Sequence, residues 1–142
     1  MKTDIKEKKC VINIEEMPNV IVCDSIKISQ VFSNLIRNAM KFREKDKESI
    51  ITIGCVECIE NWSFYVQDNG IGISKENRES IFKLFGRLHS HQEYEGSDIG
   101  LAICAKIIKA HNGQITVDSE LGVGSTFKFS IDKFLAPAVI LE

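Results

Sequence analysis

One amphipathic helix, set between pairs of strand-like segments, most strongly limits what this chain can fold into. Apolar residues recur every three or four positions between Ser25 and Glu44, which predicts a helix with Asp24 as its N-cap. A helix that is apolar along one face must pack that face against another layer. The predicted apolar stripe consists of Ile28, Val31, Phe32, Leu35, Ile36, Ala39 and Met40.

Segments with a period of two supply the other layer. They predict six strands, at residues 10–16, 19–23, 49–57, 62–67, 114–120 and 125–132. Two further helices are predicted, a short one around 74–82 and one from Ile99 to His111, separated by an aperiodic loop over 83–98. This order predicts a two-layer α+β domain, with one sheet and its helices on one face.

The bulk composition excludes several classes of protein. The 142 residues suffice for one domain. The net charge is −2, from 18 basic and 20 acidic residues that are well mixed, so neither nucleic acid nor a membrane surface is expected as the main partner. No apolar run approaches the ~18 residues of a membrane span and no signal-peptide core is present, so we expect a cytoplasmic chain.

The five cysteines are an odd number, which indicates reduced thiols. Cys55 and Cys58 form a CxxC, but on a strand two residues three apart face opposite ways. No second CxxC is present, so a zinc site is not expected.

A polar stripe runs along the long predicted helix. At 100° per residue, Asn34, Asn38 and Lys41 fall within a narrow arc, with Gln30 beside them. A solvated face is the simpler interpretation, but asparagine is a poor helix former, and here two occur one turn apart. A carboxamide oxygen is a good Mg²⁺ ligand, and a lysine one turn further on suits a phosphate. The pattern alone leaves both interpretations open.

The segment YVQDNGIGIS contains a carboxylate that points toward the core. Strand alternation places Asp68 on the same face as Phe64 and Val66, where a carboxylate needs hydrogen-bond donors. Asp-Asn-Gly could be a hairpin turn, but Gly70 and Gly72 are more glycine than a tight turn requires. These glycines would let a flat ligand approach the backbone while Asp68 accepts a hydrogen bond from it, as from the amino group of adenine.

The stretch GSDIG, residues 96–100, opens a predicted helix, as phosphate-binding loops do. It matches neither the P-loop pattern nor the dinucleotide-binding pattern. On spacing alone it is a weak signal that also fits an ordinary helix start.

Taken together, QVFSNLIRNAMKF, DNGIGIS, IFKLFGRLHS and GSDIGLAI resemble, in that order, the N, G1, F and G2 boxes of sensor histidine kinases. The resemblance covers residues 1–134 as the ATP-binding catalytic domain of the GHKL class, and 135–142 as a C-terminal tail whose last Leu-Glu is interpreted as a remnant of expression. The stretch FGRLHSHQEYEG is most similar to phytochrome-type and PAS-linked kinases. The resemblance implies a Bergerat-type fold: a two-layer α/β sandwich in which a mixed sheet carries three helices on one face. ATP and Mg²⁺ would bind between sheet and helices, under a lid formed by residues 86–98.

The resemblance also implies roles for single residues. Asn38 would coordinate Mg²⁺, Lys41 would bind phosphate, and Arg87 would meet the terminal phosphates. Asn34 stands where ATP-hydrolysing relatives carry a water-activating glutamate; an amide cannot take that proton, which favours transfer to a histidine. Further expected nucleotide contacts are Phe42, Asp68, Gly70, Gly72, Ile73, Phe85, Leu88, His89, Gly96, Ser97, Asp98, Ile99, Gly100, Leu101 and Thr126, with Phe42, Asp68 and Thr126 near the adenine.

The partners follow from the same resemblance. Histidine kinases accept phosphate on a histidine in a dimerising hairpin ahead of this domain, and the 23 residues before Asp24 are too few for it. His89, His91 and His111 are poor acceptor candidates, and His111 is expected to stabilise a helix C-terminus. We therefore expect the acceptor on a dimerisation domain of the same kinase, a response regulator as an indirect partner, and a monomeric isolated chain.

Asp98 departs from the family pattern, in which a glycine is expected. An acid about 5 Å from a phosphate charge costs about 3 kcal/mol per charge at an effective dielectric of 20. One alternative is therefore a non-catalytic, pseudokinase-like nucleotide-binding or signalling module. Another is a freestanding ATPase, against which Asn34 argues.

Overall fold

The computed structural model describes residues 10–78, 81–82 and 97–135, and every structural statement below concerns these residues. They contain one five-stranded sheet in the order β1-β2-β3-β5-β4. The first strand pairs parallel to its neighbour, and all other pairs are antiparallel, so the expected mixed sheet is confirmed. The strands are β1 Cys10–Ile14, β2 Ser49–Glu57, β3 Asn61–Asp68, β4 Ile115–Glu120 and β5 Gly124–Asp132.

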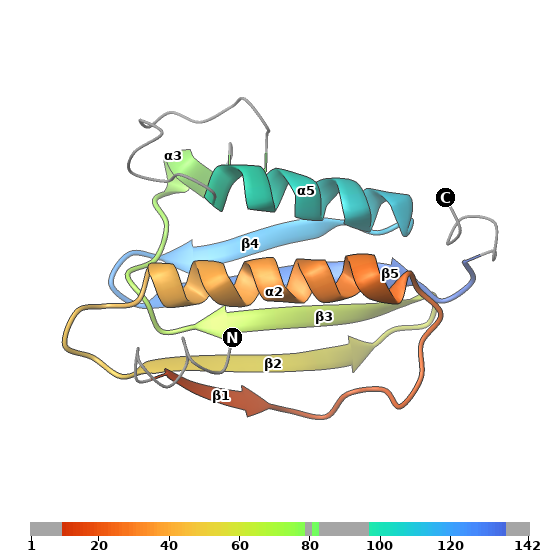
Figure 1. The fold of residues 1–142 in the computed structure, drawn as a ribbon, viewed down its shortest axis with the longest axis horizontal. Helices are drawn as coiled ribbons and strands as arrows, with labels where there is room; N and C mark the ends of the chain where they lie inside the picture. Colours follow the sequence, from red (N-terminus) through yellow and green to blue (C-terminus); the bar gives the residue numbers. More distant parts are fainter. Residues whose placement is uncertain (1–9, 79–80, 83–96, 136–142) are drawn as a thin grey trace.

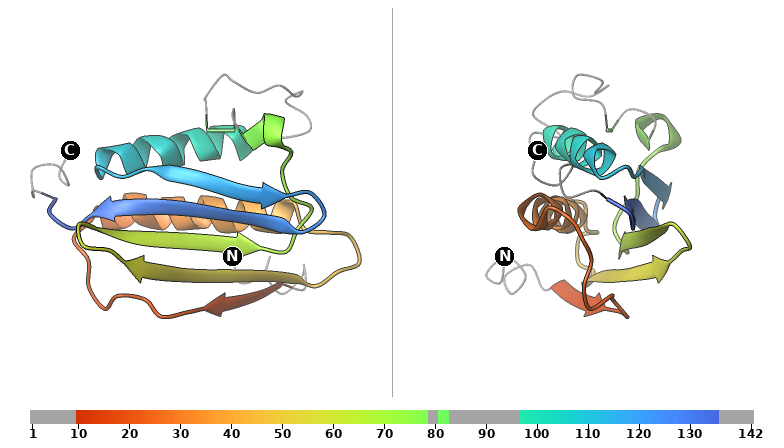
Figure 2. Two further views of the ribbon diagram at one scale, coloured as in Figure 1. Left: turned by 180° about the vertical axis from the view of Figure 1, so that it is seen from behind. Right: turned by 90° about the vertical axis from the view of Figure 1, so that its right-hand side faces the viewer.

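Two long helices lie side by side on one face of this sheet, which makes the two-layer sandwich (Figures 1 and 2). They are α2 Ser25–Lys41 and α5 Ser97–Ala110, while the short α3 Lys75–Arg78 lies beside β4. The C-terminal end of α2, the C-terminal end of β3 and the N-terminal end of α5 all lie at the same end of the molecule (Figure 1). Within the described residues, no helix is both long and apolar enough to cross a bilayer.

Helix α2 forms where its periodicity predicts it. The Asp24 side chain accepts a hydrogen bond from the Lys27 N–H at 3.1 Å, which confirms the predicted N-cap. The apolar stripe packs into the core, and the Phe32 ring contacts Phe64 and Phe129 edge-on at 5.7 and 5.1 Å. The helix ends at Lys41, three residues before the predicted end.

The strand predicted at residues 19–23 is wrong, because this segment forms an irregular connection and pairs with no strand in the described part of the chain. Its period of two is nevertheless real: Ile21 and Cys23 pack against the core, while Val20 and Val22 are 81% and 53% exposed. Alternating burial thus reflects an irregular connection with alternate side chains packed on the core, without ladder hydrogen bonds to make it a strand.

His111 joins the two helices at the opposite end of the molecule. Its buried ring receives a hydrogen bond from the Asp24 N–H at Nε2 (3.1 Å), and its Nδ1 lies 2.8 Å from the Ile107 carbonyl. A ring that accepts at Nε2 and donates at Nδ1 is the neutral tautomer. His111 therefore closes the end of α5 through Ile107, as expected, and also fixes the start of α2.

Candidate nucleotide-binding site

Asp68 ends β3 on the face that carries the helices. Its side chain is 9% exposed, on the side of Phe64 and Val66, which confirms the orientation predicted from strand alternation. Its Oδ1 accepts hydrogen bonds from the Gly70 N–H at 2.8 Å and the Ser125 N–H at 3.3 Å. Burial raises the pKa of this carboxyl group, and the two backbone hydrogen bonds partly offset the rise.

The glycines after Asp68 form a connection between elements rather than a hairpin turn. The Phe42 carbonyl, at the end of α2, accepts a hydrogen bond from the Ile71 N–H at 2.9 Å, and the Ile71 carbonyl accepts one from Gly122 at 2.9 Å. A side chain at Gly70 would place its Cβ 2.5 Å from the Phe42 carbonyl oxygen, and Gly72 has φ +81°. Both glycines are therefore required for the close backbone contacts that hold this end of α2 against the sheet.

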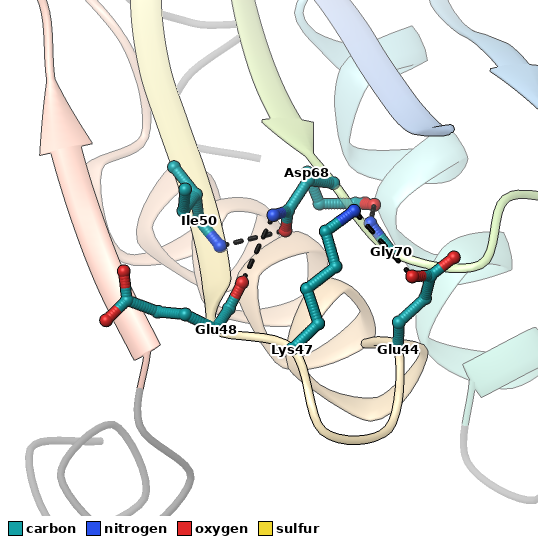
Figure 3. Close-up of polar contacts among 7 residues, drawn as sticks. Glu44, Lys47, Glu48, Ile50, Asp68 and Gly70 are labelled. Atoms are coloured by element: carbon teal, nitrogen blue, oxygen red, sulfur yellow. Dashed lines mark hydrogen bonds and ion pairs between the residues drawn. The ribbon is translucent and has the colours of Figure 1, made fainter. Parts of the chain in front are cut away.

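Asn69 is a residue of this region that sequence reasoning did not identify. Its Oδ1 accepts from the Ile50 N–H at 2.9 Å and its Nδ2 donates to the Glu48 carbonyl at 3.1 Å, so it fastens the end of β3 to the start of β2 (Figure 3). The exposed Lys47–Glu44 ion pair nearby, at 3.7 Å, contributes little because water screens it (Figure 3). The position of Asp68 thus rests on backbone and amide hydrogen bonds.

Asn38 brings an amide oxygen into the site from α2. The residue is 5% exposed, and its Oδ1 is buried with no hydrogen-bond partner among the described residues. A buried acceptor without a donor is costly unless a ligand completes it, and a neutral oxygen fits the preference of Mg²⁺ for oxygen ligands. No group of three or more His, Cys, Asp or Glu side chains that could hold a metal occurs in the described part of the chain. In proteins Mg²⁺ usually keeps several waters and binds through one or two protein oxygens together with substrate phosphates, and the Asn38 Oδ1 could supply one such oxygen.

Asn34 and Lys41 lie on the same helix as Asn38 but have different surroundings. The Asn34 Nδ2 donates to the Gly100 carbonyl at 3.4 Å and lies 3.7 Å from the Cys104 sulfur, so this amide joins α2 to the first half of α5. Burial raises the pKa of Cys104 to about 11, so its thiol keeps its hydrogen at neutral pH. Lys41 is exposed, with Nζ 5.8 Å from the centre of the Phe42 ring.

The predicted phosphate-binding stretch is described only in part. Helix α5 begins at Ser97, two residues before its predicted start, and the Leu101 side chain is buried in the core, so Leu101 can offer a ligand only its backbone. The side chains of Ser97, Asp98 and Ile99 lie outside the described part of the chain, and so do the remaining predicted contacts: Phe85, Arg87, Leu88, His89 and Gly96.

The Thr126 side chain faces the other side of the sheet from the Asp68 side chain. In the register of β3 and β5, Asp68 stands opposite Ser125, and Thr126 stands opposite Gln67 on the outer face. Thr126 lines a hollow of about 440 Å³, and Asp68 and Ser125 are also among the residues that line it. Ser125 is 6% exposed and shares its face with Phe127 and Phe129. Strand alternation counted back from these phenylalanines also identifies Ser125 on the face of Asp68, which sequence reasoning did not single out. A contact of Thr126 with adenine stays a prediction.

Ile73, the last predicted contact of the G1 segment, is held by its backbone. Its N–H donates to the Ser119 Oγ at 2.7 Å, and its side chain packs partly against the core. Ser119 was not identified from the sequence, although alternation in β4 places it on the inner face with Val117. The site therefore extends to the β4–β5 hairpin.

Comparison with known proteins identifies the family of this chain. Residues 23–134 match the family described as histidine kinase-, DNA gyrase B-, and HSP90-like ATPase. The phytochrome-like protein Cph1 of Synechocystis sp. is 47% identical over 131 residues, which are 92% of this chain and 17% of that protein. Cyanobacterial phytochrome A of Nostoc sp. is 44% identical over 131 residues, with the same two coverages. The chain thus spans a small part of the length of these relatives.

Solved structures give the same assignment. The catalytic domain of histidine kinase ThkA has a TM-score of 0.77 at 27% identity, with 93% of this chain and 84% of that chain covered. Full-length ShkA in complex with AMPPNP has a TM-score of 0.76 at 27% identity, with 95% of this chain and 28% of that chain covered. The family match and these relatives together show that this chain belongs to the histidine kinase-, DNA gyrase B- and HSP90-like ATPases, as the domain of that family found in histidine kinases.

Proposed function

We propose that this chain binds Mg-ATP and transfers the γ-phosphoryl group to a histidine on a separate dimerisation domain of the same kinase. Asp68 is the observation that carries the proposal. Both hydrogen bonds that described residues donate to it go to Oδ1, so Oδ2 is the oxygen for a ligand donor. A buried carboxylate held in this way suits the amino group of adenine.

The groups that would bind the rest of the nucleotide lie at the same end of the molecule. Asn38 and Lys41 come from the last turns of α2, and the N-terminus of the 14-residue α5 lies at that end too (Figure 1). Free backbone N–H groups and the helix dipole make such a terminus favourable for phosphate. This shared location supports the proposal that both sets of groups bind one nucleotide.

Asn38 would give Mg²⁺ one oxygen ligand through its buried, unpartnered Oδ1. When bound, the metal would offset negative charge on the phosphates, which is the main demand of phosphoryl transfer. Lys41 would add a positive charge from an exposed side chain beside the site. Asn38 and Lys41 thus supply the metal-binding and charge-neutralising parts of the site.

Asn34 supports transfer to an imidazole over hydrolysis. Its amide donates hydrogen bonds toward α5, to the Gly100 carbonyl and the Cys104 sulfur. An amide in this position cannot act as the base that removes a proton from water. An imidazole needs no such base, because its neutral nitrogen already carries a lone pair for the bond to phosphorus. In the full kinase a response regulator would then receive the phosphoryl group, with this domain in the cytoplasm.

The direct test supplies a dimerisation hairpin of a related histidine kinase in trans and measures acid-labile, base-stable phosphate on it. We expect labelling that needs Mg-ATP and that is lost in Asn38→Ala and in Asp68→Asn. Steady release of free phosphate by this chain alone, without labelling of the hairpin, would instead identify an ATPase.

A non-catalytic nucleotide-binding or signalling module is the second candidate, and Asp98 is the observation in its favour. The comparison of this chain with Asp98→Gly separates the two. If only the glycine variant binds ATP or labels the hairpin, the acid silences the phosphate site. If both variants label it, the acid is accommodated and the kinase proposal stands.

A further inference from the structure

Ser119 on β4 is the centre of a hydrogen-bond network next to Asp68. Its Oγ accepts from the Ile73 N–H at 2.7 Å, lies 2.9 Å from the Gly124 carbonyl oxygen and lies 2.8 Å from the Ser125 Oγ. Its own carbonyl accepts from the Arg78 guanidinium at 2.7 Å. The hydroxyl therefore joins the segment after Asp68 to the β4–β5 hairpin.

The number of hydrogens in this network decides the direction of each bond. A carbonyl oxygen can only accept, so the single hydrogen of the Ser119 hydroxyl goes to Gly124. The contact between the two hydroxyls is then a hydrogen bond only if Ser125 donates to Ser119. In this arrangement the Ser119 Oγ accepts two hydrogens and donates one, and every contact is satisfied.

This arrangement determines where the hydroxyl hydrogen of Ser125 points. Its hydroxyl hydrogen is used by Ser119, so its oxygen presents only lone pairs to the space beside Asp68. Ser125 and Asp68 are directly opposite in the β3–β5 register, where side chains on one face lie about 5 Å apart. The ligand-facing oxygens of both residues are thus acceptors.

We propose that Ser119 is a positioning residue for base specificity: by accepting the Ser125 hydroxyl hydrogen, it makes Ser125 a second acceptor beside Asp68 and so selects a 6-amino purine over a 6-oxo purine. The proposal rests on the nucleotide-binding function proposed above. A 6-amino group carries two hydrogens, which two acceptors can share directly or through one water. A 6-oxo group would bring a third acceptor to the same place and leave lone pairs facing one another.

The test measures dissociation constants of Mg-ATP and of Mg-ITP, its 6-oxo analogue, by calorimetry, and thermal unfolding of each variant. In Ser119→Ala the Ser125 hydroxyl regains a free hydrogen that can turn toward a 6-oxo group. We expect the ratio of the ITP to the ATP dissociation constant to fall about fivefold, as the loss of one hydrogen bond predicts. Ser119→Thr keeps the hydroxyl on a strand that accepts β-branched residues, and should keep the wild-type ratio.

Ser130→Ala is the matched control. The Ser130 Oγ also accepts a backbone N–H, from Gln114 at 3.0 Å, but at the other end of β5. It should change stability without changing the ratio. If Ser119→Ala does not fold, Ser119→Cys keeps the shape with a poorer acceptor, and its ratio should fall in the same direction by less.

The outcomes separate this inference from the function on which it rests. An unchanged ITP-to-ATP ratio in a folded Ser119→Ala, with both nucleotides weakened alike, would give Ser119 a structural role only and overturn the inference. A wild-type chain that binds neither nucleotide would instead overturn the proposed function.

Discussion

The carboxyl group of Asp68 is buried, and burial disfavours its negatively charged form. Its pKa is raised from 3.8 by burial, with backbone hydrogen bonds from Gly70 and Ser125 opposing the rise. A carboxyl group whose pKa is higher in the folded chain stabilises the fold below its ordinary pKa, and this contribution is lost as pH rises through the folded-state value. The charge of Asp68 therefore lowers the stability of the empty domain at neutral pH. In the proposed function, this carboxylate would accept a hydrogen bond from the nucleotide.

Asp68→Asn should consequently be more stable than the wild type at pH 7, with the difference shrinking as pH falls toward 4. The same variant should lose its stabilisation by ATP, because an amide turned to accept from Gly70 presents N–H groups to the adenine amino group. At a hundred times the dissociation constant, the wild type gains about 2.7 kcal/mol, roughly 5–10 °C. Thermal unfolding with and without Mg-ATP between pH 4 and 8 measures both effects. Asp118→Asn, at an exposed position, is the control, and a less stable Asp68→Asn at pH 7 would contradict the argument.

At the scale of elements, two glycines of the β4–β5 hairpin have different roles. Gly124 allows close contact between β5 and β3, whereas Gly122 only provides the backbone conformation of the turn. Gly124 has φ +141°, and a Cβ there would lie 2.1 Å from the Asp68 carbonyl oxygen. Gly122 has φ +82°, with nothing within 4 Å of an added Cβ. Gly122→Ala should cost about 1 kcal/mol of unfolding free energy, from backbone conformation alone. Gly124→Ala should cost about 1–3 kcal/mol more, because β5 must move away from β3. Denaturant unfolding of the pair measures the difference, and equal costs would show that the two strands can separate freely at this point.

The positions of helices and strands could be predicted from the sequence where the periodic pattern comes from packing one face of the element on the core. The stripe of α2 and the alternation of β2 and β3 predicted these elements within a few residues, because each packs one face on a shared core. At residues 19–23 the alternation was as clear, but Val20 and Val22 face solvent and no strand among the described residues pairs with this segment. Pairing depends on a partner elsewhere in the chain, which local pattern does not contain.

The site could be predicted residue by residue only where a side chain's direction follows from its own element. The direction of the Asp68 side chain was found in this way, by counting along β3, and the same count along β5 would have added Ser125 on that face. Ser119 could not be given a role in advance, because its importance comes from three contacts with Ile73, Gly124 and Ser125 that only the folded hairpin creates. Hydrogen-bond direction in a site is a property of the assembled network.

At the scale of the whole molecule, the side-chain amide of Asn34 links the two long helices, α2 and α5. Its Nδ2 contacts two acceptors of α5, the Gly100 carbonyl and the Cys104 sulfur, and the Cys104 thiol lies 3.9 Å from the Val31 carbonyl of α2. Because Gly100 belongs to the first turn of α5, this amide helps to set where the end of that helix proposed to bind phosphate lies relative to Asn38. Asn34 therefore connects the stability of the fold to the shape of the site.

Asn34→Asp keeps the shape of this side chain but replaces its donor group with a charged acceptor at neutral pH. We expect a loss of about 1–3 kcal/mol of unfolding free energy at pH 7, because the carboxylate would face a carbonyl oxygen and a sulfur. The pKa of the new carboxyl group should be raised in the folded chain, since its protonated form alone can donate to Gly100. The variant should therefore recover stability as pH falls, and lose it as pH rises through the folded-state pKa. Urea unfolding from pH 4 to 8 measures this against Asn13→Asp, the same change at an exposed position of β1. A penalty independent of pH would mean that packing, and not the amide hydrogen bond, joins the two helices.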